Sequence, residues 1–487
     1  MYSSIAQAVQ GHAQQIPDHL AVADVERAYT YEELAVAASQ AVKVLQEIGI
    51  KEKDAVLVEC TQKATFLILD LACEQIGAVF IPLERKMTEA RVCSIYEETE
   101  AKCVIAETVY EVAHFCSLTD LLEKMEMQPH TWEAYEEKNP VAEILFTTGT
   151  TGQPKGIVIS HQANIAIAEN IQYGTQMTGQ TVELVPMPLS HSHGLRTCYA
   201  NLLNGSAVVL LDGVMNIALF FEMIEKFGVN ALDLSPTLAK LLLKIARRGL
   251  VKYSQVIDYI EIGTAFLDDE LKGKLKEIFP SSRLYNFYGS TEAGRSCVLD
   301  FNQMDFTGCI GYPSKNAAFL IVDDEHHVMQ SSKENPGLLA VRGPMMMDGY
   351  LGNEELTRTV LIDDVLYTND LGYIDAEGRV YVLGRQDDVI NYKGIKIAPE
   401  EIETVAMQYA GIKDCACIPV PDPVRGEVPK LYVAAAANYS EQELFMVLRN
   451  GLEATRVPVF IETTDLIPRS SNGKLQRKKL REYDEKK

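Results

Sequence analysis

One run, Phe146–Gly156 (FTTGTTGQPKG), constrains this chain more than any other stretch. It combines four threonines, three glycines and a lysine. Glycine lets backbone N–H groups approach an anion closely, threonine hydroxyls donate to phosphate oxygens, and lysine adds a point charge. The run is not a Walker A loop, because Lys155 is followed by Gly156 rather than by serine or threonine. It predicts a phosphate-binding loop between a β-rich segment and a helix-like one; the alternative is an ordinary surface loop.

Composition limits the classes of protein that remain. At 487 residues the chain exceeds what one hydrophobic core organises, so we expect two or more domains. Its net charge of −23 disfavours nucleic acid or an anionic membrane as a partner, and any polyanionic ligand must meet local basic groups. We expect no signal peptide in residues 1–20 and no membrane span. The ten scattered cysteines show no metal-binding spacing and fit a reducing cytoplasm.

The pattern along the chain predicts an α/β fold. Thr30 and Glu33 have capping-box spacing before an amphipathic helix that runs to about Gly49. Apolar runs at 55–60 and 78–82 predict buried strands around a helix at 64–76, a βαβ rhythm that recurs to about residue 263. Residues 308–385 read as short strands with turns. After residue 386 the pattern restarts as a small α+β domain, with a hairpin near Gly394 and helices at 399–407 and 440–453.

A second cluster, Asn286–Gly294 (NFYGSTEAG), carries groups suited to a nucleotide. Its aromatic residues can stack on a purine, and Gly289 permits close approach. Thr291 can donate to a phosphate, and Glu292 is a hard oxygen ligand suited to Mg²⁺. Taken alone, the cluster is equally well explained as a turn with a helix N-cap at Ser290 or Thr291.

Three further segments carry polar groups on predicted loops. Asp370 and Arg385 can both hold ribose hydroxyls, although an aspartate in such a turn is more often structural. Lys474 lies beyond a Ser/Asn/Gly turn, where a solvated lysine is the ordinary explanation. His191 lies in the run Pro188–Gly194 (PLSHSHG), and a loop histidine is more often structural than functional.

Together these motifs resemble those of the adenylate-forming enzymes, which include acyl-CoA synthetases, luciferases and peptide-synthetase adenylation domains. The run at 146–156 is similar to that family's phosphate loop, Tyr288–Glu292 to its YGxTE motif, and Pro188–Gly194 to its PLxHxxG motif. The motifs follow the family's order over nearly the whole chain. The resemblance implies a large N-terminal domain of βαβ sheets, residues 1–386, with a β-rich subdomain at about 308–385. A mobile C-terminal α+β lid, residues 387–487, would turn about a hinge at Asp387.

The resemblance also implies roles for individual residues. The catalytic set would be Lys474, His191, Glu292 and Thr291, with Glu292 as the Mg²⁺ ligand. ATP or AMP would contact Thr147, Thr148, Gly149, Thr150, Thr151, Lys155, Gly263, Thr264, Ala265, Asn286, Phe287, Tyr288, Gly289, Ser290, Thr291, Asp370, Arg385 and Lys474. The acyl pocket would include Ser190, His191, Gly289, Gly294, Arg295 and Ser296. The thiol would pass Lys393 and Gly394.

The implied reaction joins a small carboxylic acid to CoA or to the phosphopantetheine of a separate carrier protein, through acyl-AMP. Residues 391–399 (NYKGIKIAP) look like those of aryl- and coumarate-CoA ligases, and Ser192 stands where amino-acid-activating relatives place an aspartate. Asn391 replaces the lysine that serves thioester formation in those ligases. The alternatives are therefore a free-standing enzyme that loads a carrier or forms an amide, and a non-catalytic nucleotide-binding protein. Arg295 could contact a polar group of the acid, or instead turn outward or pair with an acidic residue.

Overall fold

The computed structural model describes residues 2–134, 139–148, 154–304, 306, 308–393, 395–469 and 475–485. The helices in these residues are α1 (Ile5–Gln15), α2 (Tyr31–Glu47), α3 (Ala64–Ile76), α4 (Glu89–Glu98), α5 (Leu118–Glu126), α6 (His161–Thr175), α7 (Ser192–Asn204), α8 (Ile217–Phe227), α9 (Pro236–Tyr253), α10 (Asp269–Ile278), α11 (Glu354–Val360), α12 (Pro399–Ala406), α13 (Glu441–Gly451) and α14 (Arg477–Asp484).

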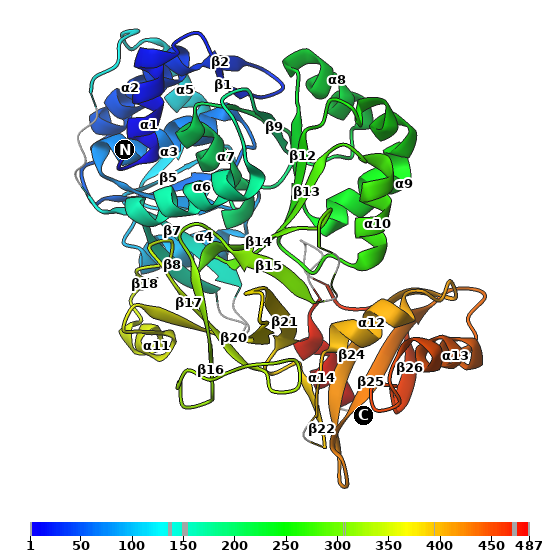
Figure 1. Ribbon diagram of the computed structural model, residues 1–487. Helices are drawn as coiled ribbons and strands as arrows, with labels where there is room; N and C mark the ends of the chain where they lie inside the picture. The colour runs from blue at the N-terminus through cyan, green and yellow to red at the C-terminus, as the bar shows by residue number, and fades with distance from the viewer. Residues whose placement is uncertain are drawn as a thin grey trace.

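The strands form three sheets (Figure 1). One contains β18 (Gly349–Tyr350), β8 (Pro154–Ser160), β7 (Val141–Thr148), β4 (Val79–Leu83), β3 (Ala55–Glu59), β5 (Cys103–Ala106) and β6 (Phe115–Ser117), in that order. The largest runs through β16 (Ala318–Val322), β17 (Gly337–Arg342), β20 (Val365–Ile374), β21 (Val380–Arg385), β15 (Cys309–Pro313), β14 (Gly294–Asp300), β13 (Arg283–Ser290), β12 (Tyr259–Ile262), β11 (Ala231–Leu234), β9 (Val182–Val185), β10 (Ala207–Leu210), β1 (Leu20–Ala23) and β2 (Ala28–Thr30), with β19 (Leu361–Ile362) beside β20. The third holds β23 (Ile395–Ile397), β22 (Ile390–Tyr392), β25 (Gly426–Ala435) and β24 (Ile412–Asp422), with β26 (Phe460–Thr464) beside β25.

A layer of helices is buried between the first two sheets. In β3, Val56 and Val58 face the cluster that contains α1, α2, α3, α6 and α7, while Leu57 faces α4 on the opposite side. In the large sheet, Val185 faces the same helical layer and Leu184 faces α8, α9 and α10. Side chains alternate across a strand, so each sheet needs cover on both faces. The predicted α/β class is confirmed.

The parallel part of the large sheet ends at β13, which turns back as the antiparallel β14. From β14 the ladder continues through β15 into β21, β20, β17 and β16, all antiparallel. The strands after β14 lie within the β-rich stretch expected from the sequence. They bring residues that are up to about a hundred positions further along the chain close to β13.

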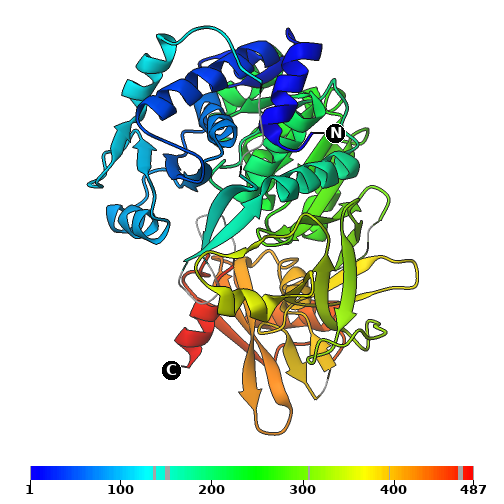
Figure 2. The same cartoon turned by 90° about the vertical axis from the view of Figure 1, so that its left-hand side faces the viewer.

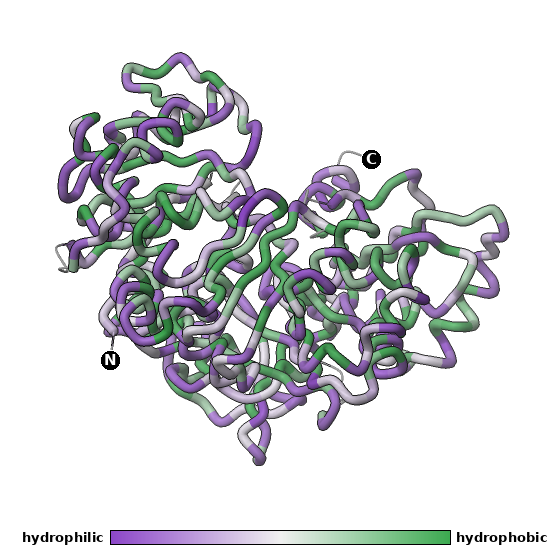
Figure 3. The backbone as a smooth tube through the Cα atoms, turned by 90° about the horizontal axis from the view of Figure 1, so that it is seen from above, coloured by the Kyte–Doolittle hydropathy of each residue, from purple (hydrophilic) through white to green (hydrophobic). Residues whose placement is uncertain are grey.

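The C-terminal residues have cores of their own. Two hydrophobic clusters draw all their buried members from residues 390–480, on the two faces of the third sheet. Cys415 and Cys417 lie in one cluster and Ala416 in the other, as expected for neighbours on a strand. In Figure 2 this orange and red unit lies in the lower half of the view, away from the blue N-terminal helices at the top. The hydropathy-coloured tube of Figure 3 is green over much of the interior, whereas many of the outer turns are purple.

Local expectations hold well, with one correction. Thr30 caps α2 in a complete capping box with Glu33, and Ser440 caps α13. The segment that follows the phosphate-loop run is not helical, however: it is the strand β8, antiparallel to β7, and α6 begins only at His161. Alternation of Ile157, Val158 and Ile159 across a strand explains why the strand prevails, because both faces of this sheet are covered.

All ten cysteines are free thiols and all lie in described positions. None of the helices in the described residues combines the length and hydropathy needed to cross a bilayer.

Candidate functional site

The β7–β8 hairpin carries the ends of the phosphate-loop run. Thr147 is the cross-strand partner of Lys155, and the tip, Gly149–Gln153, lies outside the described residues, as do the side chain of Thr148 and the predicted roles of Thr150 and Thr151. The Lys155 Nζ lies 5.2 Å from the centroid of the Tyr350 ring. The hairpin therefore places the ammonium group of Lys155 at the start of β8, directly after the loop in the sequence.

Glu292 contacts the same tyrosine as this cation. The Tyr350 hydroxyl donates to Glu292 Oε1 at 3.2 Å, and the backbone N–H of Met347 donates to the Glu292 carbonyl at 2.8 Å. Burial, and secondly Glu292, raises the pKa of Tyr350. Tyr350 lies on β18, a two-residue strand paired with β8. The sequence reasoning missed it, because nothing in so short a strand marks it before the fold is known.

A second group joins the Asn286–Gly294 cluster to the predicted pair Asp370 and Arg385. The Tyr288 hydroxyl donates to Asp370 Oδ2, and Arg385 Nε lies 3.5 Å from Asp370 Oδ1. Asp370 and Arg385 are cross-strand partners in the β20–β21 ladder. Burial first, and then the Asp370 carboxylate, raise the pKa of Tyr288. A carboxylate and a guanidinium on adjacent strands, beside a ring, form a surface that suits a sugar with vicinal hydroxyls.

The turn between β13 and β14 determines where these groups lie. A Cβ on Gly289 would lie 1.9 Å from the Gly294 carbonyl oxygen, so the ladder is too close there for any side chain. The register also shifts between Tyr288 and Gly289, which is a β-bulge. Ser290 Oγ accepts from the Ala293 N–H at 3.1 Å, which supports a turn at this serine. The expected helix N-cap is wrong, because β14 rather than a helix begins at Gly294.

Gly263, Thr264 and Ala265 follow β12 at the carboxyl end of the parallel strands. Thr264 has φ of +77°, which is unusual for a β-branched residue and typical of constrained functional loops. A Cβ on Gly263 would lie 2.4 Å from His193 Cε1, so the glycine makes room for that ring. The Asn286 side chain donates to the Ile262 carbonyl at 3.0 Å and ties β13 to this strand end.

The two histidines of the third motif have different surroundings. His191 is the N-cap residue of α7, and its Nε2 lies 3.8 Å from Glu84 Oε1. Burial lowers the pKa of His191, against the opposing effect of Glu84. His193 Nε2 lies 2.6 Å from Asp233 Oδ1. An Asp–His pair fixes the imidazole's orientation, so His193 is the more firmly held of the two.

Arg295 is buried and ion-paired. Its Nη1 lies 2.5 Å from Glu261 Oε2. Of the alternatives that the sequence left open, pairing with an acidic residue is therefore the arrangement in the structure. Arg196 behaves in the same way, since its guanidinium pairs with the buried Glu143.

The hinge and thiol residues lie near the C-terminal unit. Lys393 is exposed with φ of +50°, and its N–H donates to the Arg425 carbonyl at 2.9 Å. Gly394 and Lys474 lie outside the described residues. The Asp387 carbonyl accepts from Arg481 of α14, and the Asp388 carboxylate pairs with the same guanidinium at 2.6 Å. The last helix thus contacts the backbone of the predicted hinge.

Three fully buried carboxylates on neighbouring parallel strands also went unnoticed in the sequence. They are Glu183 on β9, Asp233 on β11 and Glu261 on β12. Burial, reinforced by Glu261 and Asp233, raises the pKa of Glu183 well above its usual range. The sequence marks these carboxylates only as single acidic residues within apolar strands. That they lie side by side follows from the strand order, which the sequence does not show.

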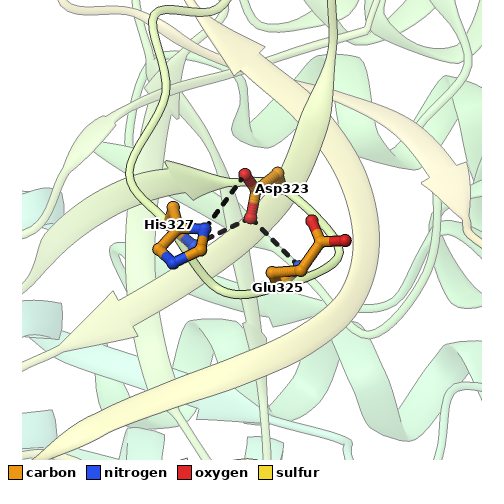
Figure 4. Close-up of side chains that lie close together, drawn as sticks. All are labelled: Asp323, Glu325 and His327. Atoms are coloured by element: carbon orange, nitrogen blue, oxygen red, sulfur yellow. Dashed lines mark hydrogen bonds and ion pairs between the residues drawn. The ribbon is translucent and has the colours of Figure 1, made fainter.

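A fourth group, Asp323, Glu325 and His327, is shown in Figure 4. Asp323 Oδ1 accepts from the N–H groups of Glu325 and His327 at 3.0 and 2.8 Å, so the aspartate organises a tight turn. Glu325 and His327 are exposed. Turn formation accounts for the cluster, and we assign it no metal.

Comparison with known proteins places this geometry in a family. The profile of the family described as "AMP-binding enzyme" matches residues 9–351, and that of the "AMP-binding enzyme C-terminal domain" matches residues 401–474. This chain belongs to the AMP-binding enzyme family.

Members of this family with known names are similar to the chain over most of its length. The 4-coumarate–CoA ligase 1 of Solanum tuberosum is 27% identical over 491 residues, covering 94% of this chain and 89% of the relative. The 2-succinylbenzoate–CoA ligase of Listeria monocytogenes is 27% identical over 465 residues, covering 94% and 95%. The crystal structure of ATP-bound MatB from Rhodopseudomonas palustris shares the fold, with a TM-score of 0.88 at 23% identity and 99% of both chains covered.

The chemistry of the described residues fits the nucleotide that this AMP-binding family implies. Asp370 and Arg385 offer an acceptor and donors for hydroxyls, Lys155 offers a cation for phosphate, and Glu292 offers a carboxylate oxygen for a hard cation. The aromatic residue Tyr288 lies near the end of β13, just before the turn that carries Glu292. These groups come from four separate segments and meet around the β13–β14 turn.

We predict that Glu183→Gln changes how stability depends on pH. The raised pKa means that folded Glu183 retains a proton that the unfolded chain releases above its ordinary pKa, so its contribution to stability falls as pH rises above that ordinary pKa, by at most about 1.4 kcal/mol per pH unit. Glutamine cannot titrate and can still bond Asn201 and Tyr259. The Tm of the variant should therefore rise relative to the parent as pH increases.

The matched control is Glu123→Gln, which replaces an exposed glutamate of α5. Thermal melts of the three proteins across this pH range check the prediction. A constant difference between Glu183→Gln and the parent at every pH would show that the buried carboxyl is ionised throughout.

Proposed function

We propose that this protein is an ATP-dependent carboxylic acid:CoA ligase that forms acyl-AMP and then a thioester. The observation that carries the proposal is the convergence of Tyr288 with Asp370 and Arg385, cross-strand partners from a distant hairpin, together with Glu292 and Lys155, which both contact Tyr350. Two named relatives over nearly the full length are CoA ligases, and the proposal extends that reaction class to this chain.

In the first half-reaction a carboxylate oxygen attacks the α-phosphorus of ATP, the bond to the bridging oxygen breaks, and pyrophosphate leaves. Asp370 and Arg385 would hold the ribose, and Lys155 with the threonines of its loop would hold the phosphates. Glu292 would bind Mg²⁺, which neutralises phosphate charge when bound. Lys474 would contact the substrate carboxylate and the α-phosphate. Catalysis of this kind is mainly positioning and electrostatic stabilisation.

In the second half-reaction a thiol sulfur attacks the acyl carbon, the acyl–phosphate C–O bond breaks, AMP leaves, and the thiol proton is lost. The C-terminal unit would turn about Asp387 between the two steps, withdrawing Lys474 and bringing Lys393 and Gly394 to the thiol path. His191 lies at the N-terminus of α7, where the acyl pocket and the thiol path would meet. Domain closure of this type often limits turnover.

Asn391 supports a second candidate, an enzyme that passes the acyl group to a carrier-protein phosphopantetheine or to an amine. The residue stands where the resembling ligases have lysine, and its side chain is exposed on β22. ATP–pyrophosphate exchange would occur in both enzymes. Release of AMP that depends on free CoA, measured with a panel of carboxylic acids, separates the first candidate from the second.

We predict that Lys474→Ala lowers acyl-adenylate formation by about 100-fold or more and largely spares thioester formation from supplied acyl-AMP. The reason is that the lysine is assigned to the first half-reaction alone. Pyrophosphate release and thioester yield measure the two steps separately. Equal losses in both would show that Lys474 does not divide the reaction in this way.

We predict that Glu292→Gln weakens ATP–pyrophosphate exchange strongly, with the largest deficit at limiting Mg²⁺, because an amide is a poorer ligand for a hard cation. Glu292 is partly exposed, so the fold should persist. Tyr350→Phe is the matched control, since it removes the hydroxyl that contacts Glu292 and keeps the carboxylate. Near-normal exchange by Glu292→Gln at limiting Mg²⁺ would falsify the assignment.

We predict that Asp387→Pro traps the C-terminal unit in the orientation that serves the first half-reaction, because proline fixes φ near −65°. Acyl-adenylate should still form, whereas thioester formation should fall by an order of magnitude or more, about the cost of blocking a required closure. Asp387→Ala, which removes the same carboxylate and leaves φ free, is the matched control. Undiminished thioester synthesis from acyl-AMP by Asp387→Pro would place the hinge elsewhere.

A further inference from the structure

The C-terminal unit contacts the large sheet through α12, which packs on β21. Glu400, in the first turn of α12, lies against Gly384 of β21: a Cβ on that glycine would be 3.1 Å from Glu400 Oε2 and 3.8 Å from Glu400 Cδ. The next residue of β21 is Arg385, which is directed at Asp370 in the candidate site. The contact spans the predicted hinge, because Gly384 precedes Asp387 in the chain and Glu400 follows it.

The two carboxylate oxygens of Glu400 have different surroundings. Oε1 lies 2.9 Å from Arg477 Nη1. Oε2, the oxygen nearest to Gly384, is buried and has no hydrogen-bond partner among the described residues. A buried carboxylate oxygen without a donor is costly when the group is ionised and much less so when it is protonated. The contact with β21 therefore favours the neutral form of Glu400.

The guanidinium of Arg477 is shared among three carboxylates. Its Nη2 donates to the two oxygens of Glu403 at 2.8 and 2.7 Å. Its Nη1, which lies near Glu400, is also 3.9 Å from Asp388 Oδ2. Arg481 of α14 pairs with the same Asp388 at 2.6 Å. Among these five side chains, three carboxylates face two guanidinium groups, so one negative charge is in excess.

The neighbouring strands supply no charge that would offset this excess. Cys417 of β24 faces Glu400, and burial raises the pKa of its thiol well above the ordinary value, so the thiol is neutral. Gly384 of β21 has no side chain, and the guanidinium of Arg385 beside it lies 3.5 Å from the Asp370 carboxylate. The protonation of Glu400 is therefore set by the carboxylates and arginines named above, and by burial.

These surroundings give the direction in which Glu400 responds to pH. Burial raises the pKa of Glu400, Arg477 opposes that effect, and Glu403 and Asp388 reinforce it, to about 7. If the C-terminal unit moves away from β21, Gly384 no longer covers Oε2 and water reaches it, which lowers the pKa towards its ordinary value. The neutral carboxyl thus stabilises the contact with β21, and the ionised carboxylate weakens it.

We propose that Glu400 is a positioning residue that couples proton binding to the orientation of the C-terminal unit. In the docked orientation, that of this structure, neutral Glu400 holds α12 against β21; loss of its proton favours a released orientation in which Glu400 has left Gly384. This role rests on the proposed function, in which the unit turns about Asp387 between the two half-reactions. By linkage, the ratio of released to docked molecules rises with pH between the ordinary pKa of a glutamate and about 7, and is constant above it.

Small-angle X-ray scattering of the ligand-free protein tests this coupling without any catalysis. Between about pH 5.5 and about pH 7.5 the ratio of released to docked molecules should rise by about tenfold in the parent. Glu400→Gln keeps the shape of the side chain but cannot ionise, so its ratio should be the same at both pH values. Glu401→Gln is the matched control and should behave as the parent, because Glu401 is the adjacent carboxylate and pairs with Arg456 inside the C-terminal unit.

Two scattering results would overturn the proposal. One is a parent profile that is identical at the two pH values. The other is a Glu400→Gln profile that changes with pH as much as that of the parent. Since the first result concerns the parent alone, the proposal can be rejected even if Glu400→Gln does not fold.

The two half-reactions supply a second readout, which a purely structural role of Glu400 would not move. The measured quantity is the ratio of thioester formation from supplied acyl-AMP to acyl-adenylate formation from ATP. Its change over the same pH range should differ by about tenfold between the parent and Glu400→Gln. Ionisation of the thiol affects all three proteins equally and cancels in this comparison. An equal pH dependence of the ratio in the parent and Glu400→Gln overturns the proposal.

The two readouts also separate this role from the proposed function. If neither half-reaction occurs with any acid of a panel of carboxylic acids, the proposed function fails. The scattering comparison of the parent with Glu400→Gln then still decides whether the protonation of Glu400 controls the orientation of the C-terminal unit.

Discussion

The close contact of β13 and β14 at Gly289 and Gly294 is the constraint on which the candidate site depends. The strands approach so closely that no side chain fits at Gly289, and the ladder shifts register there. Tyr288, just before the contact, reaches Asp370; Glu292, in the turn, reaches Tyr350; and Arg295, just after it, reaches Glu261. One hairpin thus supplies a member of each polar group, and a displaced turn would disturb all three.

Much of this arrangement could be predicted from local signals. The Thr30–Glu33 box and the run Ala64–Ile76 gave the helices α2 and α3, because capping and apolar periodicity act over a few residues. Asp370 and Arg385 were singled out as a pair, and they are cross-strand partners. Residue assignments at the tip of the phosphate loop and at Lys474 stay predictions, since those positions lie outside the described residues.

The rest depends on contacts between distant segments. The segment that follows the phosphate-loop run was expected to be helical, but pairing with β7 keeps it in a strand as far as Ser160, which is a tertiary effect on a short apolar run. Tyr350 lies beside Glu292 only because β18 pairs with β8. Glu183, Asp233 and Glu261 are ordinary acidic residues in the sequence and become a buried group only through the strand order β9–β11–β12. No spacing in the sequence predicts that these three carboxylates lie together.

The contact between α14 and the backbone at Asp387 has a consequence for how the C-terminal unit is built. Arg481 and Arg477 of this helix bind the carboxylates of Asp388, Glu400 and Glu403, so the end of the chain is clamped to the segment where the unit begins. These ion pairs connect two segments of the unit that lie about ninety residues apart in the sequence. A truncation after Lys479 would remove Arg481, so the backbone at Asp387 would lose a hydrogen bond that comes from 94 residues further along the chain.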